Sequence, residues 1–223
     1  MIITTIIFDL DGTLLDTVQD VHFCSNAALR EMGLPPISLA QAKRSIGPGS
    51  DTFSRITLGE EHMHRFGEFI KIYRKYYRDK CIDKTRPFPG IIEVLQQLQD
   101  TNLLVATNKP LKYTNVILEN LQLMHYFKSV LGPEDVAHPK PEPDMILLGL
   151  QRVGDIPERT LMVGDTDNDI AAARAANVIS CAACWGYGDA ESLKNAKPDF
   201  FSETPASLLD IIINERTQRQ ASL

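Results

Sequence analysis

The segment of residues 5–16, TIIFDLDGTLLD, constrains the fold and the chemistry of this chain more than any other stretch. An apolar run at residues 6–8 leads directly into two acids, Asp9 and Asp11, which enclose one leucine and precede Gly12. Such a run predicts a buried strand, and the glycine predicts that the strand ends in a turn. The segment therefore places charged oxygens at the carboxyl edge of a sheet, where open α/β folds bind their ligands.

Two carboxylates at this spacing carry a chemical implication. If the strand continues through Asp9 and Asp11, both side chains face the same side and repel each other unless a cation or a shared proton compensates. Mg²⁺, a hard cation with oxygen ligands, suits such a position in phosphate chemistry. One acid would then act as a nucleophile and the other as a general acid and base. The alternative is a structural turn in which both acids accept hydrogen bonds from backbone amides.

Length, charge and apolar content limit the class of protein. The chain has 223 residues, of which 43% are hydrophobic, which fits one large domain or one domain with an insertion. A net charge of −6 argues against nucleic acid or an anionic membrane as partner. No apolar run approaches the ~20 residues of a membrane span, and the start lacks the pattern of a signal peptide. We therefore expect a cytoplasmic monomer or homodimer that acts on a small molecule.

The four cysteines include a C-x-x-C pair, Cys181 and Cys184. The pair lies in an apolar run, VISCAACWG, which predicts a buried strand. Residues three apart on a strand face opposite sides, and no second pair or paired histidines complete a zinc site. We therefore interpret both cysteines as buried apolar side chains, in preference to a redox or metal site.

The pattern of residues 17–83 is helical throughout. Helical periodicity, Gly33 as a terminator and a capping box at Ser38 and Gln41 predict a small bundle of four helices with short connections. The expected helices span residues 17–32, 38–47, 51–58 and 60–79. No convincing strand lies among them.

The rest of the chain alternates strands and helices. The expected strands are 103–107, 129–131, 160–164, 178–183 and 199–201, and the expected helices are 91–100, 110–121, 143–153, 168–176 and 205–215. Continuous apolar strands joined by helices predict a parallel sheet covered on both faces. The fold expected is therefore an α/β, Rossmann-like, doubly wound core of residues 1–16 and 84–223, with residues 17–83 inserted as a helical domain. The polar tail, TQRQASL, is expected to fray.

Two further segments carry polar residues at expected strand ends. Thr107 and Asn108 end one strand just before a helix, where a hydroxyl and helix amides suit a phosphate oxygen, although either residue could simply cap the helix. Lys140 lies in a proline-rich run, HPKPEP, which restricts its backbone and suits it to neutralise a phosphoryl group or a carboxylate. A lone lysine is otherwise an ordinary surface residue.

A third strand end holds an acidic cluster. The strand TLMVG is followed by Asp165, Asp167 and Asp169. A turn can bring Asp165 and Asp169 to one point, which favours a metal. Acids at a helix start also act as N-caps, and the residues alone do not separate the two interpretations.

Taken in order, the acid pair, threonine, lysine and second acid cluster resemble the four motifs of the haloacid dehalogenase superfamily. The first motif has its DxDGT signature, and the resemblance extends over essentially the whole chain. Most members of that superfamily are magnesium-dependent phosphatases and phosphomutases. Because Asp11 is present, the resemblance favours phosphoester chemistry over ion transport or dehalogenation.

The resemblance implies roles for individual residues. Asp9 would be the nucleophile, forming an aspartyl-phosphate, and Asp11 the general acid and base. The implied phosphate ligands are the amides of Leu10 and Asn108, together with Thr107 and Lys140, which also counters the charge of Asp9. The implied magnesium ligands are Asp9, the backbone carbonyl of Asp11, Asp165, and Asp169 through water.

The helical insertion resembles the small cap of the same superfamily. Its loop SIGPGS, residues 45–50, is a candidate for substrate contact through Gly47, with an interhelical turn as the alternative. The pieces FDLDGTLLDT, RPFPGI, ATNK, VGDTDNDIAAARAA and WGYG are most similar to the phosphoglycolate phosphatase group, which implies 2-phosphoglycolate as substrate. Asn177, where that group usually has glycine, and the proline in the cap loop are departures from the pattern.

Four other functions remain open. A β-phosphoglucomutase-like sugar phosphomutase would share all four motifs. A phosphatase for a sugar phosphate, a nucleotide or pyrophosphate is equally compatible with them. A phosphonate hydrolase would need a cap lysine such as Lys43 in Schiff-base position. A non-catalytic phosphate-binding regulatory protein on this fold is the fourth.

Overall fold

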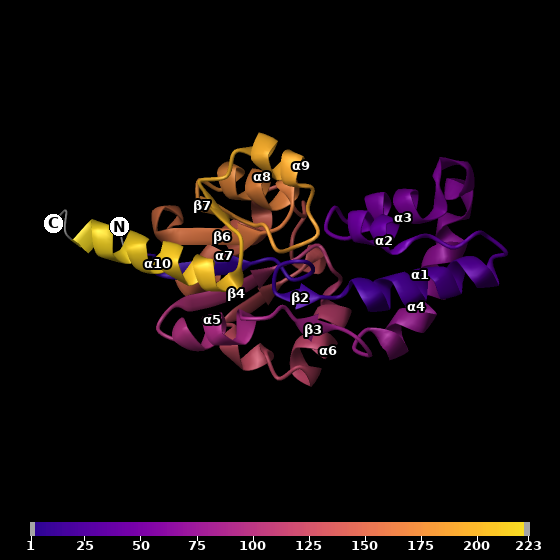
Figure 1. Ribbon diagram of the computed structural model, residues 1–223, viewed down its shortest axis with the longest axis horizontal. Helices are drawn as coiled ribbons and strands as arrows, with labels where there is room; N and C mark the ends of the chain where they lie inside the picture. The colour runs from indigo at the N-terminus through magenta and orange to yellow at the C-terminus, as the bar shows by residue number, and fades with distance from the viewer. Residues whose placement is uncertain (1–2, 221–223) are drawn as a thin grey trace.

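The protein forms a six-stranded parallel sheet with helices on both faces and a group of helices beyond one edge (Figure 1). The computed structural model describes residues 3–220, and the side chains of residues 3–214. The strand order is β5-β4-β1-β6-β7-β8. The strands are β1 (Thr5–Phe8), β4 (Asn102–Ala106), β5 (Ser129–Leu131), β6 (Thr160–Gly164), β7 (Ile179–Ala183) and β8 (Phe200–Ser202). The predicted α/β doubly wound parallel sheet is confirmed.

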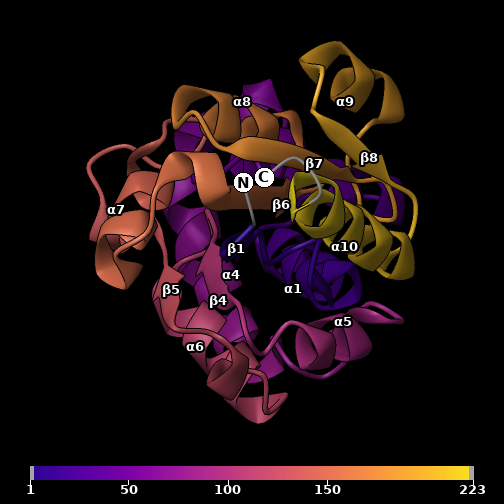
Figure 2. The same cartoon turned by 90° about the vertical axis from the view of Figure 1, so that its left-hand side faces the viewer.

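The two faces of the sheet bury different side chains of the same strands. On β1, Ile6 and Phe8 pack on one face, in a core shared with α5 (Ile91–Gln97), α6 (Leu111–Asn120) and α10 (Pro205–Gln220). Ile7 faces the other way, toward α7 (Asp144–Val153) and α8 (Asp167–Ala175). Figure 2 shows these two layers of helices on opposite sides of the strands. Burial on both faces explains why the strands are apolar without alternation.

The chain between residues 17 and 83 is helical, as expected. It contains α1 (Val18–Glu31), α2 (Leu39–Ser45), α3 (Ser50–Leu58), a 3₁₀ helix (Glu60–Arg65) and α4 (Phe66–Lys80). The capping box of Ser38 and Gln41 is present at the start of α2. The single helix expected over 60–79 is wrong, because Gly59 and the polar run after it form a 3₁₀ turn before α4 begins. These helices lie together beyond the carboxyl edge of the sheet (Figure 1).

Three further elements differ from the prediction. A short antiparallel pair, β2 (Leu15–Asp16) and β3 (Arg86–Pro87), joins the two connections between the sheet and the helices. A helix, α9 (Ala190–Ala196), begins at an Asp189 N-cap and had no predicted counterpart. Helix α10 continues to Gln220, so most of the tail expected to fray is helical, in keeping with the helix propensity of Glu, Arg and Gln. Residues 221–223 of that tail lie outside the described residues.

The central position of β1 determines where a ligand can bind. β1 pairs with β4 on one side and with β6 on the other. The chain therefore leaves the middle of the sheet in both directions, which opens a crevice at the carboxyl ends of these three strands. The connections that follow them carry the acids, Thr107 and the second acid cluster.

The two cysteines of the C-x-x-C pair differ in burial. Both are free thiols; Cys181 is buried on β7 in the apolar core as expected, whereas Cys184 follows the strand and is only half-buried. Within residues 3–220, no helix combines the length and the apolar character that a membrane crossing requires.

Candidate active site

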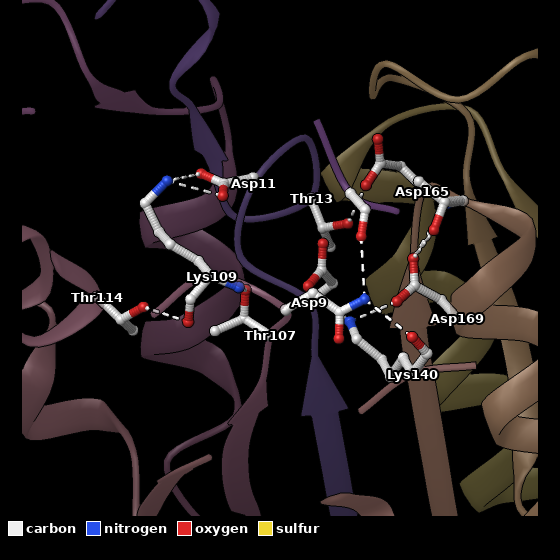
Figure 3. A network of polar contacts seen from close by, with 12 residues as sticks. Asp9, Asp11, Thr13, Thr107, Lys109, Thr114, Lys140, Asp165 and Asp169 are labelled. Carbon is white, nitrogen blue, oxygen red and sulfur yellow. Dashed lines mark hydrogen bonds and ion pairs between the residues drawn. The ribbon is translucent and has the colours of Figure 1, made fainter. Parts of the chain in front are cut away.

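Asp9 follows β1 directly and is buried at the carboxyl edge of the sheet. The strand ends at Phe8, so the condition under which both acids would face the same side of a strand is not met. The backbone N–H of Asp9 still donates to Val163 of β6, which fixes the start of the turn. The chain then turns, and the side chains of Asp9 and Asp11 point in different directions (Figure 3).

Lys140 is the cation that compensates Asp9. Its ammonium group donates to Asp9 Oδ1 at 2.7 Å and to Asp169 Oδ1 at 2.6 Å, and its side chain is 2% exposed. The lysine comes from the loop between β5 and α7, at the position expected from the proline-rich run. It therefore joins the ends of β1 and β6, since Asp9 lies 131 positions before Lys140 and Asp169 lies 29 positions after it.

Asp169 caps the start of α8 and also faces the site. Its Oδ2 accepts hydrogen bonds from the backbone N–H and the hydroxyl of Thr166, which forms the capping box of α8. Its Oδ1 accepts from Lys140 and faces Asp9. One oxygen thus holds the helix start and the other faces the site.

Asp165 is held by two donors. Its Oδ1 accepts from the Thr13 hydroxyl at 2.9 Å, and its Oδ2 accepts from the backbone N–H of Tyr187 at 2.8 Å. Gly12, which has φ +88°, passes so close that a Cβ there would lie 2.2 Å from Oδ2. Only glycine allows this approach, which explains the glycine after the two acids.

The three acids Asp9, Asp165 and Asp169 form a set that fits a divalent cation. Their nearest carboxylate oxygens all lie within 4.8 Å of one another, and all three residues are buried. Fully ionised, the set would carry three negative charges against the single positive charge of Lys140. A hard cation with oxygen ligands matches both the donor type and this excess of charge.

The pKa values show the same imbalance of charge. Burial raises the pKa of Asp9 to about 7, against the opposing effect of Lys140. Burial and the neighbouring charges of Asp9 and Asp169 raise the pKa of Asp165 above its ordinary value. Burial alone would lower the pKa of Lys140, but Asp169 and Asp9 raise it above its ordinary value, so the lysine stays charged.

Asp11 has its own cation, Lys109, which the sequence reading did not identify as a site residue. The Lys109 ammonium donates to both carboxylate oxygens of Asp11, at 2.9 and 3.1 Å, and both side chains are nearly buried. It also lies 4.9 Å from the ring centroid of Tyr77 on α4. The sequence offered one signal for Lys109: it directly follows the polar strand end of Thr107 and Asn108, in a predicted site that has more acids than cations.

Thr107 and Asn108 line the site without capping α6. The Thr107 hydroxyl accepts from the backbone N–H of Lys109, and α6 begins later, at Leu111. The Asn108 amide donates to the carbonyls of Gly47 and Lys140, at 3.1 and 3.0 Å. Within residues 3–214, neither the backbone N–H of Leu10 nor that of Asn108 donates to another protein group.

A cavity of about 570 Å³ lies over these residues, between the sheet edge and the helical segment. Its floor includes Asp9, Asp11 and Thr107 together with both lysines, 109 and 140. The opposite wall is mostly apolar and comes from the helical segment. Its apolar and aromatic residues are Val21, Ile46, Gly47, Pro48, Phe53, Ile70, Tyr73 and Tyr77, and Ser45, Gly49, Ser50, Asp51 and Arg74 complete the wall.

The loop of Gly47 lies on the sheet edge. A Cβ at Gly47, which has φ +104°, would lie 2.8 Å from the Thr166 methyl group, so the close contact depends on glycine. Lys43 does not line the cavity, and its ammonium group lies 5.8 Å from the ring centroid of Tyr187. The structure thus brings Gly47 to the cavity and leaves Lys43 outside it.

Known proteins are similar to this chain over nearly its full length. The haloacid dehalogenase-like hydrolase family matches residues 6–183. Phosphoglycolate phosphatase of Aliivibrio fischeri is 35% identical over 219 residues, which cover 94% of this chain and 96% of that protein. Phosphoglycolate phosphatase of Aquifex aeolicus is 32% identical, again over 94% of this chain and 96% of its own length.

A solved structure agrees with the sequence relatives. The crystal structure of a predicted phosphoglycolate phosphatase from Haemophilus somnus superposes with a TM-score of 0.87 at 30% identity, covering 93% of this chain and 97% of that one. The family match, the shared fold and the nearly full-length similarity lead to one conclusion. This chain belongs to the haloacid dehalogenase-like hydrolases and is a phosphatase of that family.

Proposed function

We propose that this phosphatase hydrolyses a small phosphomonoester, 2-phosphoglycolate in the first instance, with Asp9 as nucleophile and Mg²⁺ as cofactor. The observation that carries the proposal is the buried Asp9, paired with Lys140 and open to a cavity of about 570 Å³. The substrate follows the phosphoglycolate phosphatases of similar sequence and the resemblance of the motifs.

The first step forms a covalent intermediate. A carboxylate oxygen of Asp9 attacks phosphorus, and the bond from phosphorus to the ester oxygen breaks. Asp11, which faces the same cavity, donates a proton to the departing alcohol oxygen. Lys140 offsets the charge of Asp9 and of the transferring group.

The second step returns the enzyme to its starting state. Asp11, now ionised, accepts a proton from a water molecule, whose oxygen attacks phosphorus and displaces the Asp9 carboxylate. Inorganic phosphate leaves, and Asp11 holds the proton for the next cycle. The free amides of Leu10 and Asn108, with the Thr107 hydroxyl, supply donors for the phosphoryl oxygens.

The residues present fit Mg²⁺. Asp9, Asp165 and Asp169 would hold it, with the backbone carbonyl of Asp11 as a further oxygen ligand, because the first three converge and are short of positive charge. When bound, the ion would stabilise negative charge on the transferring phosphoryl group.

We further propose that residues 17–83 act as a cap over the site. The helical segment supplies the apolar wall of the cavity. It contacts the sheet edge through the Gly47 carbonyl, which accepts from the Asn108 amide, and through the Tyr77 ring, which lies near the Lys109 ammonium group. A wall of this kind excludes water from the reacting group and selects the leaving group by shape.

Phosphate release tests the proposal. We expect release from 2-phosphoglycolate with Mg²⁺, little without it, and none from the Asp9→Asn variant. A panel of sugar phosphates, nucleotides and pyrophosphate ranks the alternatives by kcat/KM. Phosphate release by pure Asp9→Asn at the wild-type rate contradicts the mechanism. Isomerisation of a sugar phosphate without phosphate release would instead identify a mutase.

A further inference from the structure

A basic groove lies beside the active-site cavity, between α4 and α6. It has a volume of about 830 Å³ and is lined by one face of α4 and the first turns of α6. Its charged residues are Lys71, Arg74, Lys75, Arg78 and Lys112, and within residues 3–214 no Asp or Glu lines it. This concentration of positive charge stands out on a chain whose net charge is −6.

The spacing of these cations on α4 is unfavourable for the helix itself. Residues 71, 74, 75 and 78 are three and four positions apart, so their charges are neighbours on one face. Like charges at this spacing cost a helix about 0.2–0.5 kcal/mol per pair. A solvated helix face usually mixes the two signs, but the acids of α4 are Glu68, which pairs with Arg65 of the preceding 3₁₀ helix, and Asp79, and neither lines the groove.

Acidic residues of the same chain pair with only some of these cations. Lys75 lies 3.5 Å from Glu31 and Arg78 lies 3.2 Å from Asp79, both in exposed pairs. Within the described side chains, Lys71, Arg74 and Lys112 have no acidic partner. Lys112 instead lies 4.7 Å from the ring centroid of Tyr113, a residue of the groove wall.

The groove and the cavity share one wall. Ser50, Ile70, Arg74 and Tyr113 line both. An anion in the groove is therefore next to the chamber where the reacting phosphate lies, and Arg74 faces both spaces. Arginine forks match phosphate and carboxylate oxygens, and lysines add point charges that neutralise them.

We propose that this groove binds a multiply charged, phosphate-bearing anion through Lys71, Arg74 and Lys112. Two sources supply that chemistry: a distal phosphate of the substrate itself, or a separate effector next to the site. The substrate source rests on the proposed phosphatase function, whereas anion binding in the groove does not.

The first experiment measures binding alone. Inorganic tripolyphosphate is titrated calorimetrically into the wild type, the triple variant Lys71→Gln/Arg74→Gln/Lys112→Gln, and a control, Lys43→Gln/Arg44→Gln/Lys84→Gln. The control changes the charge equally at exposed residues outside the cavity and the groove. We expect the groove variant to bind about tenfold more weakly, the control to bind as the wild type does, and wild-type affinity to fall with salt. Equal binding by the two triple variants, or none by the wild type, overturns the proposal.

The second experiment identifies the source, at buffered free Mg²⁺. A distal substrate phosphate predicts a KM for fructose 1,6-bisphosphate about tenfold below that for fructose 6-phosphate, lost in the groove variant. An effector predicts equal KM values, and a change in 4-nitrophenyl phosphate turnover on adding tripolyphosphate that the groove variant lacks. If the wild type hydrolyses none of these esters, the proposed function fails while the titration still decides the groove.

Discussion

At the scale of single residues, the site separates two acids that are neighbours in the sequence. Asp9 is paired with Lys140 and Asp11 with Lys109, so each carboxylate has its own ammonium group. The separation arises because the strand ends at Phe8 and the chain turns through Gly12. The two tasks proposed for these acids, bond formation for Asp9 and proton transfer for Asp11, are consistent with their two different surroundings.

Lys109 is expected to position Asp11. Its replacement by methionine keeps the length of the side chain and leaves the Asp11 carboxylate without its partner at 2.9 Å. We expect kcat to fall by about 10²-fold, the scale of an impaired acid and base, with a smaller change in KM. Because breaking a nearly buried ion pair also costs about 3–5 kcal/mol, thermal unfolding is recorded on the same sample. Lys43→Met, at an exposed lysine outside the cavity, is the control, and a wild-type kcat in Lys109→Met rules out the role.

Thr13 is expected to tune the proposed metal site through Asp165. Thr13→Val preserves the shape of the side chain and removes the donor that lies 2.9 Å from Asp165 Oδ1. Loss of such an outer contact typically weakens a metal site by about 10–100-fold, so the Mg²⁺ concentration for half-maximal activity should rise by that factor. Thr160→Val, at a buried threonine that begins β6 and whose hydroxyl donates to the Ile156 carbonyl, is the comparison. An unchanged Mg²⁺ requirement in Thr13→Val would refute this coupling.

At the scale of elements, the loop between α2 and α3, residues 46–49, makes the most specific contact between the helical segment and the sheet edge. Gly47→Ala combines a strained backbone at φ +104° with a Cβ 2.8 Å from Thr166. Gly59→Ala has a similar positive φ, +74°, but no atom within 4 Å, so it isolates the cost of the backbone alone. We expect both variants to lose about 1 kcal/mol of stability. Only Gly47→Ala should also lose about tenfold in kcat/KM, because its loop is displaced from the sheet edge.

The sequence predicts elements better than their junctions. The strands β5 and β6 begin and end where their apolar runs do, and the capping box at Ser38 forms as expected. The two-residue strands β2 and β3 are too short to leave a pattern. The break at Gly59 agrees with the expected helices 51–58 and 60–79, but the 3₁₀ helix of Glu60–Arg65 was missed because its polar residues also fit an α-helix.

For the site, the order of the residues is predictable from the sequence, but the pairing of their side chains is not. The order of Asp9, Thr107, Lys140 and Asp165 along the chain predicts that their strand ends meet, because parallel strands bring their carboxyl ends to one edge. The pairing of Lys109 with Asp11, 98 positions away, depends on side-chain directions that no local pattern encodes. The bridge from Asn108 to Gly47 likewise depends on where the helical segment lies against the sheet.

At the scale of the whole molecule, the uncompensated acids couple folding to pH and to the metal. Burial raises the pKa of Asp9 from 3.8 to about 7 and that of Asp165 above its ordinary value. Between about pH 4 and pH 7 the folded state therefore holds protons that the unfolded chain has lost, so these acids make the metal-free protein less stable as pH rises. A bound cation replaces those protons, so its stabilising effect should grow with pH.

Thermal unfolding with and without Mg²⁺ measures this coupling. We expect the increase in Tm on adding Mg²⁺ to be small near about pH 5 and larger near about pH 8. In the Asp165→Asn variant one raised pKa is gone, and the pH dependence of the increase should be weaker. An increase in Tm that is equal at both pH values, or larger at the lower one, would mean that these acids do not bind the cation.

The proposed mechanism requires that Asp9 becomes phosphorylated during turnover. Asp11→Asn should slow the hydrolysis of that intermediate, whereas 4-nitrophenyl phosphate, with its good leaving group, needs little help from an acid in the first step. Mass spectrometry of the acid-quenched Asp11→Asn enzyme, after incubation with 4-nitrophenyl phosphate and Mg²⁺, should show one added phosphoryl group on the peptide that contains Asp9. Asp9→Asn/Asp11→Asn should show none. If the Asp11→Asn enzyme turns over 4-nitrophenyl phosphate but carries no phosphoryl group, or carries it on another residue, Asp9 is not the nucleophile.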